Sequence, residues 1–145
     1  MAMSVDLANE YLREVKLSWA TKPTLCNTVT ADGAMIRMNA AERTIKALAL
    51  ASGTPFSNTH KVVGVLEQLP CDQRLKDGFH WVAQQVEQLR SGVPYPGDPA
   101  YIFHTRHTDM GYWDRFERDC EALMSLGEAV IDYEQGGGSH PPGWR

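Results

Sequence analysis

The sequence predicts a mainly α-helical protein in which about five helices form a compact bundle, with one small β-hairpin near residues 27–38. Two observations carry this prediction. Apolar residues recur every three to four positions along several segments, which is the spacing of one face of an α-helix. The chain of 145 residues is also 43% hydrophobic and 22% charged, values typical of one globular domain of ordinary size.

The first helix is expected from about Ser4 to Ala20, because its apolar residues lie four apart and Ser4 can cap its start. Those apolar residues are Leu7, Tyr11, Val15 and Trp19. Residues 25–38 follow a different pattern. The β-branched residues Thr28 to Thr30 precede the dipeptide Asp32-Gly33, which suits a tight turn, and an apolar run then resumes. This pattern predicts a short hairpin about Asp32-Gly33.

Two further helices are expected between residues 39 and 70. A helix should begin at Asn39 and continue to Ser52, since Gly53 is well placed as a left-handed stop. A third helix should follow, with Ser57 as its cap and Pro70 at its end.

The fourth helix has the most regular pattern. It should begin after Asp72 and end near Gly92, and its apolar residues repeat at spacings of four and three, so that they form a seam. We expect the residues of this seam to be buried: Leu75, Phe79, Val82, Val86 and Leu89.

The remaining chain divides into a loop, a last helix and a tail. Residues 91–100 are rich in proline and glycine and predict a loop. The last helix is expected from Thr108 or Asp109 to Tyr133, so that residues 1–135 form one globular helical domain and residues 136–145 a flexible tail. The predicted core consists of Leu12, Trp19, Ile45, Leu48, Val62, Leu66, Phe79, Val82, Val86, Phe116 and Leu123.

Charge is unevenly distributed along the chain. The net charge is −4. Residues 1–53 carry six basic and five acidic residues, whereas residues 93–145 carry four basic and nine acidic residues. The whole chain is therefore not basic, as many nucleic-acid-binding proteins are. No apolar run is long enough for a transmembrane helix, and the charged N-terminal residues lack the apolar core of a signal peptide, so we expect a cytoplasmic protein.

Residues 42–69 resemble a helix-turn-helix DNA-binding unit. The features that match are Ala49, Gly53 four residues later, then Ser57, and the apolar pair Val62-Val63. In such units the small residue lets two helices approach and the glycine turns the chain. Thr59 stands where an apolar core residue is usual, so the match is incomplete, and two ordinary helices joined by a Gly-Thr-Pro turn explain the pattern as well.

The resemblance implies a small regulatory protein that binds DNA with the exposed start of its second helix. Side chains there would reach phosphates or base edges. The candidate DNA-binding residues are Thr54, Ser57, Asn58, His60 and Lys61.

A second interpretation is a non-enzymatic protein that binds a partner or sequesters a ligand as a helical oligomer. Residues 74–86 are similar to the second helix of small helical-hairpin proteins that phages use to sequester cyclic nucleotides; Leu75, Lys76, Trp81 and Val86 carry this similarity. The acidic helix at 109–134 suits a basic protein partner. The apolar seam favours a homodimer.

Catalysis is the least favoured class, and we expect no catalytic residues, no metal and no cofactor. No phosphate-binding loop or hydrolase motif occurs. Three widely separated cysteines do not suggest a disulfide framework, and Cys120 is expected to pack as a small apolar residue. His104 and His107 are spaced so that both could face one ion, but nothing in the sequence selects the further ligands that zinc needs.

Overall fold

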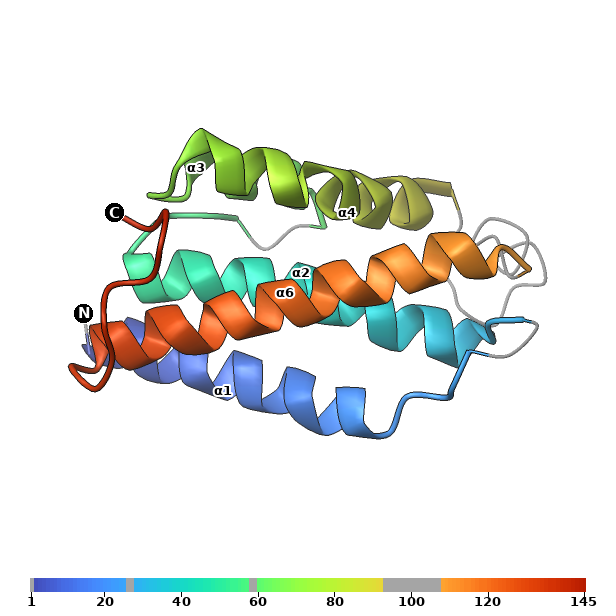
Figure 1. Ribbon diagram of the computed structural model, residues 1–145, viewed down its shortest axis with the longest axis horizontal. Helices are drawn as coiled ribbons and strands as arrows, with labels where there is room; N and C mark the ends of the chain where they lie inside the picture. Colours follow the sequence, from blue (N-terminus) through green and yellow to red (C-terminus); the bar gives the residue numbers. More distant parts are fainter. Residues whose placement is uncertain (1, 26–27, 58–59, 93–107) are drawn as a thin grey trace.

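The computed structural model describes residues 2–25, 28–57, 60–92 and 108–145, and these contain five α-helices and no strand. The helices are α1 (Ala2–Ala20), α2 (Ala31–Ser52), α3 (Val62–Gln68), α4 (Gln73–Gly92) and α6 (Met110–Glu134) (Figure 1). The predicted mainly helical bundle is therefore confirmed. None of the described helices has both the length and the apolar character needed to cross a bilayer.

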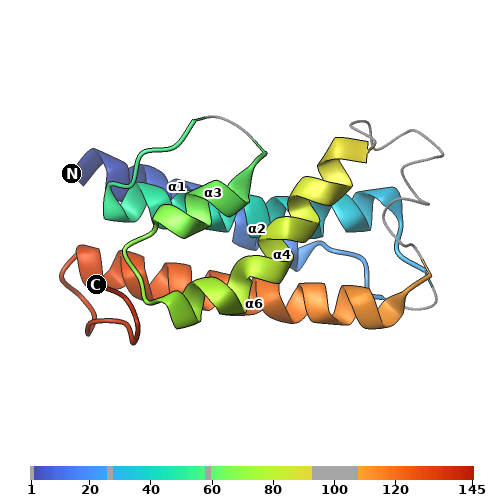
Figure 2. The same cartoon turned by 90° about the horizontal axis from the view of Figure 1, so that it is seen from above.

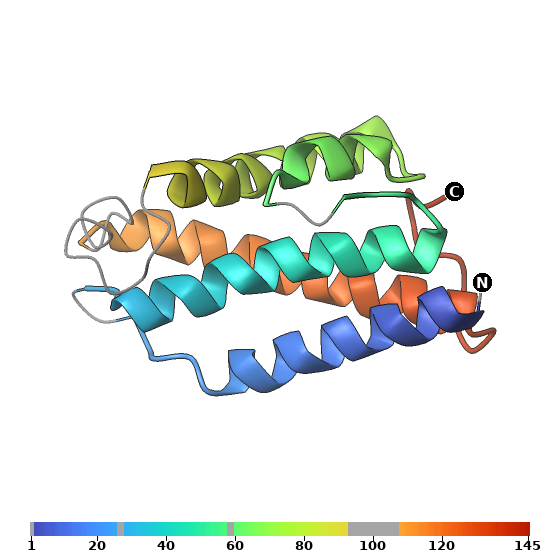
Figure 3. The same ribbon diagram turned by 180° about the vertical axis from the view of Figure 1, so that it is seen from behind.

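The helices are arranged in three levels. Figure 1 shows α1 on one side, α2 and α6 in the middle, and α3 and α4 on the other side. Figure 2, seen from above, shows α4 crossing over α2 and α6 at an angle, and the view from behind shows α2 lying between α1 and the α3–α4 pair (Figure 3). As a result, α2 contacts every other described helix.

The expected first, fourth and last helices are present, with bounds that differ from the prediction by one or two residues. Asp109 caps α6, because its Oδ1 accepts a hydrogen bond from the Tyr112 backbone N–H at 3.1 Å. Gly53 ends α2 as predicted, in the left-handed conformation with φ of 70°.

The predicted β-hairpin near residues 27–38 is wrong, because α2 already begins at Ala31. Thr30 caps the helix, with its Oγ1 accepting a hydrogen bond from the Gly33 N–H at 3.0 Å. Asp32 lies in the first turn, where a negative charge interacts favourably with the helix dipole. Local turn propensity at Asp32-Gly33 is therefore outweighed by an N-terminal cap and by burial of the helix face that follows.

The third helix also differs from its prediction. It begins at Val62 rather than near Ser57, and it has seven residues. Residues 53–61 connect it to α2. A helix-turn-helix unit has a turn of three or four residues, so the chain between α2 and α3 is longer than the resemblance implied.

The core follows the predicted pattern closely. Every residue of the predicted core is buried except Trp19, which is half-buried. In the α4 seam, Leu75 is half-buried and the other four residues are buried. Helix α2 passes through the bundle at close range because its buried face is rich in alanine: Ala34, Ala40, Ala41, Ala47, Ala49 and Ala51.

A buried arginine ties α2 to α6. Arg37 has no exposed surface. Its Nε donates to Glu117 Oε1 at 3.0 Å, and its Nη2 forms an ion pair with the same oxygen. Further bonds from its guanidinium to the carbonyls of Gly33 and Pro23 complete its hydrogen bonding. A buried guanidinium requires this degree of compensation.

A second buried cluster ties α2 to α4 and to the connection before α3. Glu42 is 5% exposed, and its Oε2 lies 3.5 Å from Lys46 Nζ. Its Oε1 lies 2.8 Å from His60 Nδ1 and 3.4 Å from Arg90 Nε. The Arg90 Nε contact lacks hydrogen-bond geometry, so it is purely electrostatic, while Arg90 Nη2 donates to Asn39 Oδ1. One carboxylate thus compensates the buried Lys46 and the half-buried Arg90.

The C-terminal segment was expected to be a flexible tail. In the structure residues 141–145 fold back onto the start of α4, and Trp144 is 3% exposed. Trp144 forms an antiparallel bridge with Cys71, and the Arg145 N–H donates to the Pro70 carbonyl at 2.8 Å. The apolar area of Trp144 gives this segment a reason to dock that its glycine- and proline-rich composition does not reveal.

Replacing Glu42 tests the buried cluster. Glu42→Ala should lower the free energy of unfolding by about 3–5 kcal/mol, because it leaves buried cations without a counter-charge. Urea denaturation followed by circular dichroism measures this. Glu14→Ala is the control: it breaks an exposed ion pair with Arg43 and should cost less than about 1 kcal/mol. Equal losses for the two variants would show that Glu42 has no special role.

Candidate functional site

The predicted DNA-binding residues lie around the connection between α2 and α3. Thr54 is half-buried, and its Oγ1 lies 2.8 Å from Ser52 Oγ. Ser57 and Lys61 are exposed. The His60 side chain is 61% exposed, and its Nδ1 is bonded to Glu42. Asn58 lies outside the described residues.

Two hollows flank Phe56 in this connection. One, of about 440 Å³, is lined by Ser57 and Lys61 together with Pro55, Phe56, Gly64, Val65 and Gln68. The other, of about 320 Å³, is lined by Thr54 together with Ser4, Ala49, Leu50, Gly53, Pro55 and Phe56. Ser57 and Lys61 therefore line one shallow hollow and Thr54 the other, while His60 lines neither.

A larger hollow lies between α4, α6 and the C-terminal segment, at the place where Figure 1 shows the chain end returning towards α3 and α4. We call it the α4–α6 hollow, and its volume is about 520 Å³. Its lining is formed by Asp72, Arg74, Leu75, Gly78, Phe79, Asp119, Ala122, Pro142 and Gly143. Apolar side chains form much of the wall, and three charged side chains contribute polar groups.

Backbone geometry holds the C-terminal wall of this hollow in place. The Asp72 N–H donates to the Gly143 carbonyl at 2.8 Å. Gly143 has φ of 77°, and a Cβ there would lie 2.8 Å from Leu75 Cδ1. Only glycine satisfies both the left-handed backbone and this close approach. By contrast, a Cβ at Gly78 would meet nothing within 4 Å, so the wall is open at that point.

Asp119 is the half-buried carboxylate of the hollow. Burial raises the pKa of Asp119, and the nearby guanidiniums of Arg115 and Arg118 oppose that rise. Among the described residues none donates a hydrogen bond to this carboxylate. Asp72 differs, since its Oδ1 lies 3.9 Å from Arg145 Nε. A carboxylate with a raised pKa in a cleft is a frequent feature of functional sites.

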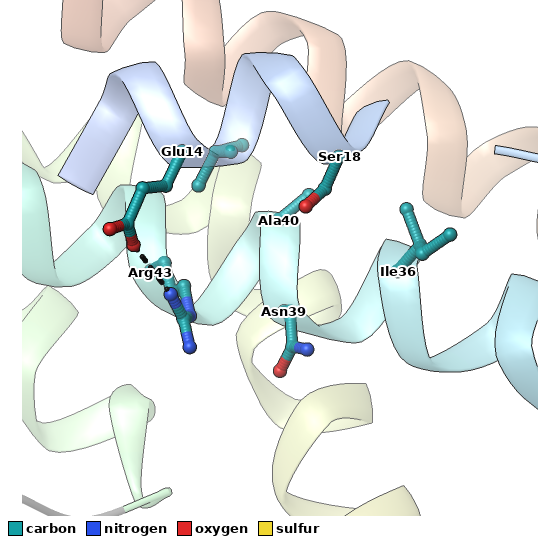
Figure 4. Close-up of a pocket in the computed structure, with 7 residues that line it drawn as sticks. Glu14, Ser18, Ile36, Asn39, Ala40 and Arg43 are labelled. Carbon is teal, nitrogen blue, oxygen red and sulfur yellow. Dashed lines mark hydrogen bonds and ion pairs between the residues drawn. The ribbon is translucent and has the colours of Figure 1, made fainter. Parts of the chain in front are cut away.

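A smaller hollow lies between α1 and α2, with a volume of about 110 Å³. Figure 4 shows Glu14 of α1 reaching Arg43 of α2 beside it, at a donor–acceptor distance of 3.0 Å. Ser18 and Asn39 add polar groups to the wall. The volume is below the range of about 300–1,000 Å³ for small-molecule sites and suits water.

The described cysteines line none of these hollows. Cys71 and Cys120 are free and buried, and Cys120 packs in the core as predicted. Burial raises the pKa of both thiols. Among the described residues no three His, Cys, Asp or Glu side chains are grouped to hold a metal ion. His104 and His107 lie outside the described residues.

Comparisons with known proteins gave no match: no family model fits the chain, and neither a curated protein nor a solved structure matches it.

Sequence reasoning identified some residues of the α4–α6 hollow but gave them another role. Leu75 and Phe79 were predicted as core. Asp119 was one of many acids on the last helix, and Gly143 belonged to the presumed tail. Gly78 was an available signal, because glycine is unfavourable inside a helix as regular as the fourth one.

The pKa of Asp119 predicts how stability depends on pH. The pKa of Asp119 in the folded protein is raised above the ordinary 3.8. The folded chain therefore binds this proton more tightly than the unfolded chain does, and the free energy of unfolding falls as pH rises through the pKa. Asp119→Asn should therefore raise the melting temperature at pH 7 and give little gain at pH 3. Thermal unfolding at both pH values measures this.

Asp114→Asn provides the control, because Asp114 is exposed on the same helix. It should change the melting temperature little at either pH. A gain for Asp119→Asn that is the same at pH 3 and pH 7 would contradict the role given to burial of its carboxylate.

Proposed function

We propose that the protein is a non-enzymatic binding protein that sequesters a small ligand in the α4–α6 hollow. One observation carries this proposal: the hollow measures about 520 Å³, within the range of about 300–1,000 Å³ for small-molecule sites. Its wall combines apolar side chains with a few charged groups, which is the usual composition of such sites. The proposal develops the ligand-sequestering interpretation of the sequence.

The surroundings of the hollow favour a preformed site. Trp81 of α4 packs edge-on against Tyr112 and Phe116 of α6, with ring centroids 5.3 and 6.2 Å apart. The Tyr112 hydroxyl donates to Gln85 Oε1 at 2.9 Å, which adds a buried polar link between the two helices. Sites built on helices held in this way keep their geometry better than sites on loops.

Filling the hollow tests the proposal. The probes are 2-phenylethylamine, 2-phenylethanol and phenylacetate, which place a cationic, a neutral and an anionic group on one apolar frame. At least one should bind the full chain, as measured by ligand-observed NMR. Gly78→Gln should weaken that binding tenfold or more, because its side chain occupies open space in the hollow.

Gly64→Gln is the matched control. Gly64 also lies inside a helix with nothing within 4 Å of its Cβ, and it lines a different hollow. Both substitutions raise helix propensity by a similar amount, so stability cannot explain a difference between them. If none of the three probes binds the unmodified chain, or if both variants bind equally well, the proposal is wrong.

DNA binding through residues 54–61 is a second candidate function. The observation in its favour is that Ser57, His60 and Lys61 are exposed beside the start of α3. Lys61 adds positive charge there, although Glu67 and Gln68 follow on the same short helix.

A DNA titration at two salt concentrations tests this second candidate. Lys61→Ala should weaken binding to all sequences and lower the salt slope by about one unit, because one phosphate contact is lost. Lys16→Ala on α1 is the control and should leave the slope unchanged. Absence of binding at low salt would remove this candidate.

A further inference from the structure

We infer that the ligand of the α4–α6 hollow is a small organic cation whose protonated amine binds Asp119 and whose apolar body packs against Leu75 and Phe79. This inference rests on the proposed ligand-binding function and adds the chemical class of the ligand. It is carried by the position of one half-buried carboxylate in a largely apolar hollow.

The Asp119 carboxylate is partly removed from water. Removing a carboxylate from water is unfavourable unless hydrogen bonds or an opposite charge replace the lost hydration. None of the described residues donates a hydrogen bond to Asp119, and burial raises its pKa. A protonated amine supplies hydrogen-bond donors and a positive charge in direct contact with the carboxylate, so binding it compensates for the burial of Asp119.

Other charged side chains also lie around the hollow. Asp72 also lines it, and Arg145 lies near Asp72, with an Nε–Oδ1 distance of 3.9 Å. Arg74 lines the hollow with an exposed side chain. Arg115 and Arg118 lower the pKa of Asp119, but by less than burial raises it. The Arg115 guanidinium lies 4.0 Å from the centre of the Trp81 ring, so it has a partner of its own.

These positions favour a cation over an anion. An anion in the hollow would lie beside the carboxylates of Asp72 and Asp119, and the exposed Arg74 would interact with it only through solvent, where ion pairs are weak. A cation meets the half-buried carboxylate of Asp119, where water is partly excluded and the attraction is stronger. Asp72 adds little, because its side chain is 61% exposed.

The hollow also offers apolar surface to a ligand. Leu75, Phe79, Ala122 and Pro142 contribute apolar surface on three sides of the hollow. Burying a hydrocarbon ring against them is favourable in proportion to the area removed from water. A bare ammonium or an inorganic cation gains nothing from these walls, so the arrangement selects an amine that carries an apolar group.

The inference predicts a pH dependence with a definite sign. Only the ionised form of Asp119 attracts the ammonium group, and its pKa lies above 3.8. The amine itself stays protonated throughout the acid and neutral range. Affinity for the cation should therefore rise as pH increases from 3.5 to 7.5, while affinity for a neutral analogue stays nearly constant.

The three phenyl probes test the inference on the full chain. At pH 7, 2-phenylethylamine should bind at least tenfold more tightly than 2-phenylethanol, and phenylacetate should bind most weakly. Asp119→Asn should bring the amine and the alcohol within twofold of each other, while Asp114→Asn should keep the tenfold preference. If Asp119→Asn does not fold, the pH titration of the unmodified chain provides the same test, because the preference must fade towards pH 3.5.

The outcomes separate this inference from the function it rests on. If the amine and the alcohol bind equally well and Gly78→Gln removes both, the hollow binds ligands but the cation inference is wrong. If phenylacetate binds most tightly, the inference is also wrong. If no probe binds, the proposed function fails and the cation inference fails with it.

Discussion

The fold depends on neutralising the charges that α2 carries into the interior. This helix contacts every other described helix, and its inner face is rich in alanine, which allows close packing but gives little specificity. Specificity comes from the charged residues Arg37, Glu42 and Lys46, all 5% exposed or less. Arg37 requires Glu117 of α6, and Glu42 is placed beside Arg90 of α4. Since an unpaired buried charge is costly, α2 stays buried only when both neighbours are in register.

That requirement explains how a hollow can persist between α4 and α6. Each of the two helices is joined to α2 by its own charged partner, and α4 also packs against α3. The aromatic cluster around Trp81 joins α4 to α6. On the side of Gly78 and Ala122 neither helix carries a side chain large enough to close the gap. The C-terminal segment covers one end of the gap, held by the buried Trp144 and by backbone bonds to residues 70 and 72.

The sequence predicted most helices because their apolar spacing is a local property that burial reinforces. It failed at Asp32-Gly33, where turn propensity suggested a hairpin and the Thr30 cap with the buried face of α2 determined the outcome. It also failed for Trp144, whose burial depends on a surface far away in the sequence. The α4–α6 hollow could not be predicted from the sequence for the same reason. Leu75 and Asp119 become neighbours only through the crossing of two helices, and no local pattern encodes that crossing.

The acidic residues of α6 have different roles in this arrangement. Glu117 pairs with the buried Arg37, and Glu128 pairs with Lys16 of α1 at the surface, so these acids have partners within the chain and do not form a uniform negative face. Asp119 has no such partner among the described residues and lies in a hollow instead of on an open surface. A structural acid lowers its free energy by pairing within the chain, whereas a half-buried acid without a donor from the chain gains stability when it binds a proton or a ligand cation.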